Sequence, residues 1–227
     1  LRILLIIELK CAPLPLKENG LEILKIIKKK YIYLISPNKI TTNFYQQLNL
    51  VLKTGKVSFF QMRFKKYSSK EKFVIGTNIK KICKRYGVKF LVNDEPRLAK
   101  KLNADGCHLG QNDMPLNEAQ KLIGKKIIGV TCHNSIKLAK IAIKSKASYL
   151  AFGAFFSSKT KKAKYNTTPR ILIEASKLTK LPLVAIGGIN CDNYKNLLLN
   201  KANFLAISGY IWNNKKYKPQ DAIKKFI

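Results

Sequence analysis

The sequence predicts an α/β protein built on a closed (β/α)8 barrel, the TIM-barrel fold, in a single domain. Eight short apolar runs alternate with longer segments in which apolar residues recur at helical spacing. This alternation is typical of parallel strands joined by right-handed crossovers. The units occupy about 200 residues, which suits a closed barrel. An open doubly wound sheet is the alternative, but such sheets usually contain fewer strands.

Each predicted strand is a short apolar run, and each predicted helix is an amphipathic segment between two runs. The strands are Tyr31–Ile35, Val57–Met62, Lys89–Val92, Gly106–Leu109, Lys126–Val130, Tyr149–Phe152, Leu183–Ile186 and Phe204–Ile207. The helices cover residues 41–53, 69–86, 95–103, 115–122, 134–145, 169–179, 190–200 and 219–227. The barrel domain therefore spans residues 31–227.

Residues 1–30 precede the first strand and form a short N-terminal extension. Pro13 and Pro15 break any early helix, whereas Leu21, Leu24 and Ile27 recur at helical spacing. We expect one amphipathic helix here, covering an end of the barrel.

The formal net charge of +32 is the most unusual bulk property of the chain. A nucleic-acid or anionic-membrane partner is one interpretation. The charge is spread along the chain, however, and no zinc-finger spacing or RNA-binding signature accompanies it, so we expect no nucleic-acid partner. A general positive field would still help to capture small anionic substrates.

The cysteine content and the hydropathy of the chain indicate the cellular compartment in which the protein works. The chain has five cysteines and no C-x-x-C pair, which favours reduced thiols in a cytoplasmic protein. The apolar run Ile3–Ile7 is closed by Glu8, far short of the roughly 20 residues that span a membrane. We therefore expect no membrane partner, whereas the sequence does not fix the oligomeric state and is compatible with a homo-oligomer.

Polar residues follow nearly every predicted strand, at the end where such barrels carry their active sites. Only the first strand lacks them. They are Gln61, Arg63 and Lys65; Asn93 and Asp94; Gln111 and Asp113; Thr131 and His133; the loop Gly153–Lys161; Gly187 and Gly188; and Ser208 and Gly209. Residues two apart in an extended segment share a face, so several of these sets can point to one place.

Three cations and two carboxylates in this set suggest a diphosphate held with magnesium. Arg63, Lys65 and Lys161 supply the positive charge, and Asp94 and Asp113 follow neighbouring strands. Magnesium is typically held by one or two carboxylates together with substrate phosphates. The alternative is that each aspartate caps the helix that follows it.

The ends of the last three strands suggest a second phosphate site. The loop Gly153–Lys161 is rich in hydroxyl and lysine side chains, which donate to phosphate oxygens. Gly187–Gly188 and Ser208–Gly209 lie where (β/α)8 barrels frequently bind phosphate through backbone N–H groups. Simple turn glycines and a solvated loop are the alternatives. A diphosphate site and a monophosphate site at one mouth suggest an enzyme that joins two phosphorylated molecules.

A zinc site is disfavoured by the placement of the histidines. His108 and His133 each follow a cysteine directly, and adjacent strand residues point to opposite faces. We expect His108 to pack in or under the barrel mouth, whereas His133 shares a face with Thr131 and can meet a ligand.

Taken together, these motifs resemble those of the thiamine-phosphate synthase family over about residues 31–215. Its patterns appear in order as Q-x-R-x-K at Gln61–Lys65, N-D at Asn93–Asp94, H-L-G-Q-x-D at His108–Asp113 and G-V-[ST]-x-H at Gly129–His133. They continue as the hydroxyl-rich loop at Gly153–Lys161, A-I-G-G-I at Ala185–Ile189 and I-S at Ile207–Ser208. Several linked motifs in order are far more specific than any one of them.

The resemblance implies a TIM-barrel transferase that condenses 4-amino-2-methyl-5-pyrimidinylmethyl diphosphate with a thiazole phosphate, giving thiamine phosphate and diphosphate. It implies a dissociative reaction, in which diphosphate leaves before the thiazole nitrogen attacks. The implied pyrimidine-diphosphate ligands are Gln61, Arg63, Lys65, Asn93, Thr131 and Lys161, of which Arg63, Lys65 and Lys161 are catalytic. The implied Mg2+ ligands are Asp94 and Asp113. The implied thiazole-phosphate ligands are Ser158, Thr160, Gly188, Ile207 and Ser208.

The chain departs from the family pattern at a few positions. A proline common after the sixth-strand glycine is Ala154 here, an acidic residue near the N-D pair is Arg97, and the segment after Lys161 is lysine-rich. The main rival function is that of the related thiazole tautomerase, which handles one monophosphate without magnesium. A non-catalytic basic binding protein on this scaffold is a rival from another class.

Overall fold

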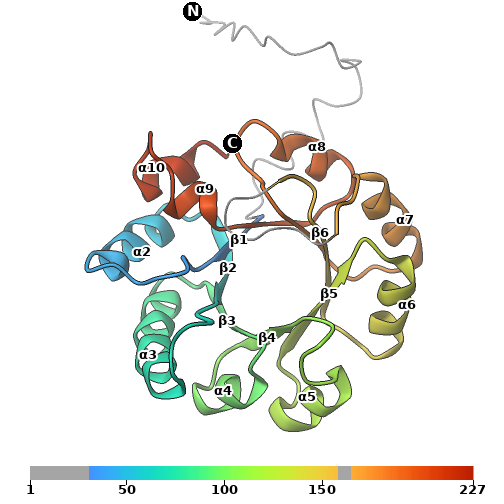
Figure 1. Ribbon diagram of the computed structural model, residues 1–227, viewed down its shortest axis with the longest axis horizontal. Coiled ribbons are helices and arrows are strands. Elements are labelled where there is room, and N and C mark those ends of the chain that lie inside the picture. Colours follow the sequence, from blue (N-terminus) through green and yellow to red (C-terminus); the bar gives the residue numbers. More distant parts are fainter. Residues whose placement is uncertain (1–30, 158–164, 227) are drawn as a thin grey trace, which may run out of the picture.

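The computed structural model describes residues 31–157 and 165–226, and it shows a closed barrel of eight parallel strands (Figure 1). Each strand pairs with its neighbours in chain order, and β1 closes the ring with β8. The strands are β1 (Ile32–Ile35), β2 (Val57–Met62), β3 (Lys89–Asn93), β4 (Gly106–Leu109), β5 (Ile127–His133), β6 (Tyr149–Gly153), β7 (Leu183–Ile186) and β8 (Phe204–Ile207). The predicted fold class is thus confirmed.

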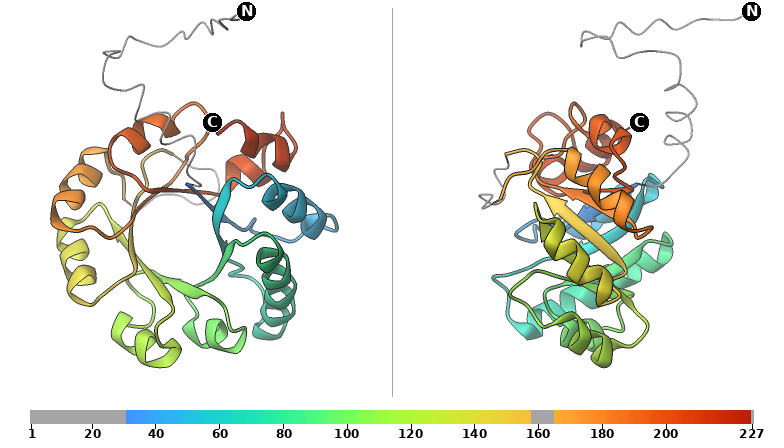
Figure 2. Two further views of the ribbon diagram at one scale, coloured as in Figure 1. Left: turned by 180° about the vertical axis from the view of Figure 1, so that it is seen from behind. Right: turned by 90° about the vertical axis from the view of Figure 1, so that its right-hand side faces the viewer.

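Helices surround the barrel on the outside, as both views of Figure 2 show. They are α2 (Phe44–Lys53), α3 (Ser69–Arg85), α4 (Pro96–Lys101), α5 (Leu116–Ile123), α6 (Ile136–Lys144), α7 (Arg170–Leu178), α8 (Tyr194–Leu199), α9 (Gly209–Trp212) and α10 (Pro219–Lys224). The short helix α9, directly after β8, was not among the predicted elements. The predicted extension over residues 1–30 lies outside the described residues.

Local sequence explains how the best-defined helix begins. In α3 the Ser68 side chain accepts from the backbone N–H of Glu71, and Glu71 accepts in return from the backbone N–H of Ser68. This capping box satisfies two otherwise unpaired donors. Farther along α3, Ile75, Ile79 and Ile82 recur on one face and are buried against the barrel.

Two hydrophobic clusters hold the domain together. The larger lies between strands and helices, and the smaller, which includes Tyr33, Leu91 and Tyr149, fills the barrel interior. Gly129 is needed beside the inner cluster, because a Cβ at this position would lie 1.8 Å from the ring of Tyr149. The lumen is therefore a packed core, and ligands can enter only at its ends.

Strand β5 runs farther than predicted, to His133, and carries a bulge. Its register with β6 shifts between Thr131 and His133, and His133 has a positive φ of 52°. The alternation of side chains is broken there. Thr131 bonds to His108, whereas His133 packs against the ring of Tyr165 with centroids 4.4 Å apart. The predicted shared face of Thr131 and His133 assumed a regular strand, and the bulge breaks that regularity.

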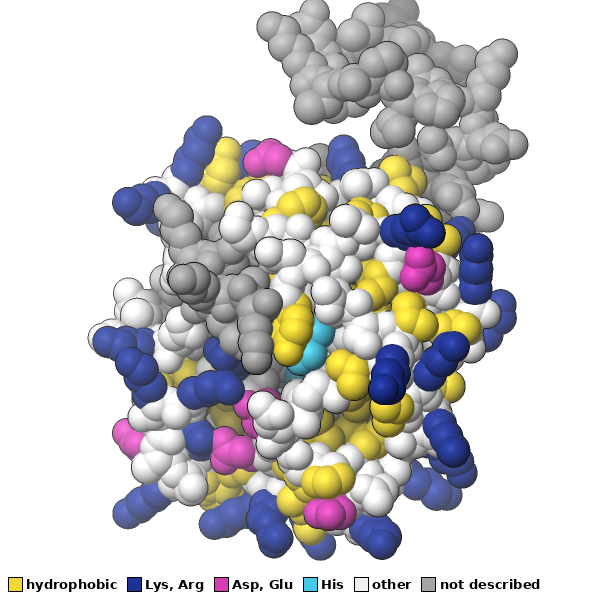
Figure 3. All heavy atoms as spheres, turned by 45° about the vertical axis from the view of Figure 1, so that its right-hand side comes forward, with side chains coloured by type: hydrophobic (Ala, Val, Ile, Leu, Met, Phe, Trp, Pro, Cys, Tyr) yellow, Lys and Arg dark blue, Asp and Glu magenta, His cyan; other side chains and the backbone are white. Residues whose placement is uncertain are grey.

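The basic residues are spread over the face in Figure 3 and gather in no single patch there. No helix in the described part of the chain is long and apolar enough to cross a membrane.

Candidate active site

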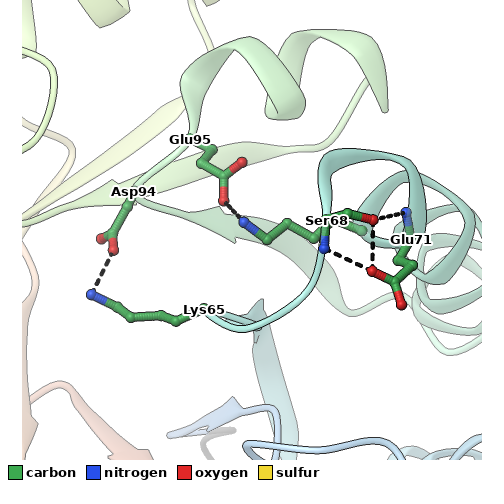
Figure 4. Close-up of polar contacts among 6 residues, drawn as sticks. Lys65, Ser68, Glu71, Asp94 and Glu95 are labelled. Atoms are coloured by element: carbon green, nitrogen blue, oxygen red, sulfur yellow. Dashed lines mark hydrogen bonds and ion pairs between the residues drawn. The ribbon is translucent and has the colours of Figure 1, made fainter.

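Charged side chains meet at the carboxyl ends of β2, β3 and β4. The ammonium group of Lys65 lies 3.2 Å from the carboxylate of Asp94 (Figure 4). Asp113, in the loop after β4, accepts a 2.6 Å hydrogen bond from the backbone N–H of Gly110. The Lys65 side chain is 59% exposed and that of Asp94 24%, so this group opens to solvent at the barrel mouth.

Backbone bonds hold Asp94 in an unusual conformation. Its φ is +62°, a region that non-glycine residues rarely adopt. The N–H of Asp94 donates to His108 O at 2.8 Å, and the N–H of Glu95 donates to Asn93 O at 2.8 Å. Such conformations persist where the surroundings enforce them, and they cluster at functional sites.

Neither aspartate caps a helix through its side chain. The N-cap of α4 is Glu95 and that of α5 is Pro115, and neither helix has a side-chain cap bond. The helix-capping alternative for Asp94 and Asp113 is therefore wrong. The Asp94 carboxylate instead pairs with Lys65, and the Asp113 carboxylate accepts from the backbone N–H of Gly110.

The electrostatics of Asp113 fit a site shared by two carboxylates. Burial, followed by the neighbouring Asp94, raises the pKa of Asp113, while the Gly110 N–H and Lys65 oppose that rise. Two like charges close together disfavour ionisation of both. A divalent cation between them would remove this repulsion, so the pair fits magnesium, which prefers oxygen ligands. No group of three or more His, Cys, Asp or Glu side chains able to hold a metal occurs among residues 31–157 and 165–226.

A second ion pair holds the residue that follows Asp94. Lys72 of α3 and Glu95 are 2.5 Å apart, and the Lys72 side chain is only 14% exposed. Figure 4 shows Glu95 beside the Lys65–Asp94 pair. A cavity of about 210 Å³ lies between them, lined by Lys65, Lys72, Asn93 and Asp94 among others. Sequence reasoning missed Lys72, because nothing in its helical spacing marks it as a partner of Glu95.

A chain of hydrogen bonds crosses the barrel interior below this site. It joins Gln61 to Tyr33 at 2.7 Å, Tyr33 to Tyr149 at 2.7 Å, Tyr149 to His108 Nδ1 at 2.8 Å, and His108 Nε2 to Thr131 at 2.8 Å. The expected position of His108 under the mouth is confirmed. Burial lowers the pKa of His108 to about 4, with Asp94 opposing the shift, so its imidazole is neutral at pH 7.

Ser36 is the polar residue that follows the first strand. Its buried hydroxyl accepts from the backbone N–H of Arg63 at 2.9 Å. Its carbonyl oxygen accepts from the hydroxyl of Ser208 at 3.0 Å. Ser36 thus ties the end of β2 to the end of β8. Its role could not be predicted from the sequence, because one serine before a proline carries no distinctive signal.

Backbone contacts shape the ends of β6, β7 and β8. Gly188 has a φ of +60°, and a Cβ there would lie 2.3 Å from Ser157 O. Gly187 is crowded in the same way by Ala154, at 2.4 Å. Phe156 N donates to Gly187 O at 3.1 Å. These glycines therefore allow the loop after β6 to lie directly on the end of β7.

Most of the predicted site residues lie in the described part of the chain, and three do not. Ten of them lie at or just below the carboxyl ends of the strands: Gln61, Arg63, Lys65, Asn93, Asp94, Asp113, Thr131, Gly188, Ile207 and Ser208. Gln61 is only 3% exposed and Ile207 only 2%. Ile207 packs in the outer core, so only its backbone can meet a ligand. Ser158, Thr160 and Lys161 lie outside the described residues.

Comparisons with known proteins agree on one family. The family model described as thiamine monophosphate synthase matches residues 32–211. A thiamine-phosphate synthase of Pelagibacter ubique is 64% identical over 200 residues, covering 88% of this chain and 97% of the relative. Another, from Erythrobacter litoralis, is 43% identical over 187 residues, covering 80% of this chain and 88% of the relative.

Solved structures share the barrel. A thiamine phosphate pyrophosphorylase from Pyrococcus furiosus superposes with a TM-score of 0.77 at 26% identity, covering 88% of this chain and 95% of that one. A 3-hexulose-6-phosphate synthase from Salmonella typhimurium has a TM-score of 0.62 at 16% identity, covering 86% of this chain and 96% of that one. The second likeness shows the fold alone.

Proposed function

This chain belongs to the thiamine monophosphate synthase family, and we propose that the carboxyl end of its barrel is the active site for that family's reaction. Its activity is that of a thiamine-phosphate synthase, a transferase of thiamine biosynthesis. The substrates are 4-amino-2-methyl-5-pyrimidinylmethyl diphosphate and a thiazole phosphate, and the products are thiamine phosphate and diphosphate.

The side of the mouth formed by β2 to β5 binds the pyrimidine diphosphate. Its proposed ligands are Gln61, Arg63, Lys65, Asn93 and Thr131, joined by Lys161 from the segment between β6 and α7. The observation that carries this proposal is the meeting of Lys65 with Asp94, 3.2 Å apart, beside Asp113. Lysine alone would suit any anion, but lysine with two carboxylates suits an anion that arrives with a metal ion.

Asp94 and Asp113 are the proposed holders of Mg2+. The raised pKa of Asp113, caused by burial and by Asp94, supports a cation at this place. When bound, Mg2+ would neutralise charge on the diphosphate oxygens.

The leaving group needs positive charge, and this is the proposed catalytic role of Arg63, Lys65 and Lys161. In a dissociative reaction diphosphate departs with its bonding electrons, and the thiazole nitrogen then attacks the pyrimidinylmethyl cation. Preorganised cations stabilise the charge that develops on the leaving oxygen. No side-chain nucleophile is required. Phe155 and Phe156, half-buried at the end of β6, are suited to keeping water from the cation.

The thiazole phosphate is assigned to the other side of the mouth. Gly188, Ser208 and the backbone of Ile207 are its proposed ligands, with Ser158 and Thr160. The Ser208 hydroxyl donates its single proton to Ser36 O, which leaves it no proton to donate to a phosphate anion. The Ser208 contact is therefore proposed to come from its backbone N–H, in keeping with phosphate sites after the last strands of such barrels.

The direct test is to incubate the protein with both substrates, with Mg2+ or with EDTA, and to measure diphosphate and thiamine phosphate. We expect coupled release of both products only with Mg2+. Isomerisation of a thiazole phosphate that is indifferent to EDTA would favour the tautomerase instead. Salt-sensitive DNA binding without turnover would favour a basic binding protein.

Variants separate the residue roles within that assay. Lys161→Ala is expected to cut turnover strongly while leaving the thermal unfolding midpoint unchanged. Near-normal turnover in that variant would remove Lys161 from the catalytic group.

We also propose a cytoplasmic location. The support is that Cys83, Cys107, Cys132 and Cys191 are all free thiols, as expected in a reducing compartment. An unchanged migration of the native protein on gels with and without reductant would agree with this proposal.

A further inference from the structure

The buried chain of hydrogen bonds below the mouth has a direction, which follows from proton counting. Its members come from five strands: Gln61 from β2, Tyr33 from β1, Tyr149 from β6, His108 from β4 and Thr131 from β5. Tyr33 is 1% exposed and Tyr149 3%. A buried hydroxyl must place its single proton on an acceptor, since leaving it unpaired costs about 1–3 kcal/mol.

The direction is set at the Gln61 end. The amide nitrogen of Gln61 faces the Tyr33 hydroxyl at 2.7 Å, and an amide nitrogen can only donate. Tyr33 therefore accepts from Gln61. Among the described residues its other partner is the Tyr149 hydroxyl, at 2.7 Å. The Tyr33 proton must then go to the oxygen of Tyr149.

The same counting fixes the next two bonds. Tyr149 accepts from Tyr33, so its own proton goes to Nδ1 of His108, 2.8 Å away. A neutral imidazole that accepts at Nδ1 carries its proton on Nε2. Nε2 lies 2.8 Å from the Thr131 hydroxyl and donates to it. The half-buried Thr131 is thus left with its own proton free of the chain.

We propose that Gln61, Tyr33, Tyr149 and His108 form a directed relay that makes the Thr131 hydroxyl a hydrogen-bond donor toward the ligand. Tyr33, Tyr149 and His108 are positioning residues, because they act through Thr131. If the proposed function holds, the acceptor is a phosphate oxygen of the pyrimidine diphosphate. Cooperative hydrogen bonds polarise one another, so a hydroxyl that accepts from His108 is a better donor to an anion.

Other contacts hold Thr131 for this task. Gln111, from the loop after β4, donates from its amide nitrogen to the carbonyl oxygen of Thr131. The bulge that follows in β5 turns His133 toward Tyr165. The empty space above Gly129 admits the ring of Tyr149. The motif Gly129–His133 thus makes room for Tyr149 through Gly129 and supplies Thr131, the last residue of the relay.

The first test needs no enzymatic activity. Nitrogen-15 NMR of the imidazoles distinguishes a protonated from an unprotonated ring nitrogen. With two histidines in the chain, His133→Gln assigns the signals. At pH 7 we expect His108 protonated on Nε2 and unprotonated on Nδ1. A proton on Nδ1 would reverse the relay and overturn the proposal, whatever the enzyme catalyses.

The second test breaks the relay beside a matched control. Tyr149→Phe is expected to change the His108 tautomer signals and to raise the KM for pyrimidine diphosphate about tenfold, the scale of one lost buried hydrogen bond. The control is Tyr31→Phe, which removes a buried hydroxyl beside Tyr194 in the outer core and should move neither quantity. An unchanged His108 spectrum in Tyr149→Phe would contradict the relay.

The third test concerns the donor itself. Thr131→Val removes the hydroxyl, and Thr131→Ser restores it. We expect the valine variant to weaken pyrimidine diphosphate binding about tenfold with thiazole phosphate binding unchanged, and serine to recover it. Equal binding by all three proteins, with the Nε2 tautomer present, would disprove the donor role while leaving the proposed function standing.

Discussion

At the ends of β2 to β4 the mouth of the barrel is lined by charged side chains, whereas at the ends of β6 to β8 it is shaped by backbone. The first side brings together Lys65, Asp94 and Asp113. The second depends on Gly187 and Gly188, where a side chain has no room. Side-chain charge suits a ligand that carries a metal ion, and backbone N–H groups suit a single phosphate. Mutations on the two sides should therefore impair the binding of different ligands.

The largest effect is expected from Asp113→Asn on the charged side. Losing a carboxylate proposed to hold the metal should lower turnover about a hundredfold or more, the scale of removing one preorganised electrostatic group. The variant is measured over a range of Mg2+ concentrations. Asp221→Asn, which removes an exposed carboxylate paired with Lys224 at 3.3 Å, is the control and should behave as the parent. Unchanged magnesium dependence in Asp113→Asn would remove this residue from the metal site.

Lys65→Ala should have the next largest effect. A charge-assisted hydrogen bond contributes about 1.5–3 kcal/mol, which corresponds to roughly a tenfold to hundredfold fall in kcat/KM for pyrimidine diphosphate. The KM for thiazole phosphate should not move, because Lys65 lies with Asp94 on the charged side. Equal changes in both constants would mean that the two sides are not separate.

Gly188→Ala tests the backbone side. The positive φ and the 2.3 Å approach of Ser157 O predict destabilisation of about 1–3 kcal/mol and a raised KM for thiazole phosphate alone. Gly55→Ala is the matched control. Gly55 has a similar φ of +73°, but a Cβ there meets nothing within 4 Å. If both variants lose thiazole phosphate affinity, backbone strain rather than the close approach is responsible.

The smallest effect is expected from the ion pair behind the charged side. Lys72→Met should raise the Mg2+ concentration for half-maximal activity a few fold, because Glu95 and the turn at Asp94 lose their support. Lys89→Met removes a comparable pair with Asp105, 3.2 Å apart, on strand ends away from the mouth, and should leave the magnesium requirement unchanged. An identical shift in the two variants would reduce the Lys72 effect to general electrostatics.

Sequence patterns predicted the position of the charged residues after the strands. An apolar run marks each strand in the sequence, and Lys65, Asp94 and Asp113 each follow the end of a strand closely. Their side chains converge because the carboxyl ends of parallel strands meet at one end of a barrel. The order of the eight strands followed from the same alternation.

Contacts that depend on three-dimensional packing could not be predicted in the same way. The relay from Gln61 to Thr131 joins five strands, so no local spacing encodes it. Gln61 itself was expected only as a ligand at the mouth, yet it is 3% exposed and bonded to Tyr33. Ser36 and Lys72 are common residue types whose partners, Arg63 and Glu95, are distant in sequence. The β5 bulge likewise depends on pairing with β6.

The most direct test of the two-sided mouth is calorimetric binding of the product diphosphate, with and without Mg2+, to the parent protein and to Asp94→Asn. We predict that diphosphate binds the parent tightly only with Mg2+, and that Asp94→Asn loses this binding while still binding thiazole phosphate. Diphosphate binding that ignores both Mg2+ and the substitution would contradict the assignment of the charged side.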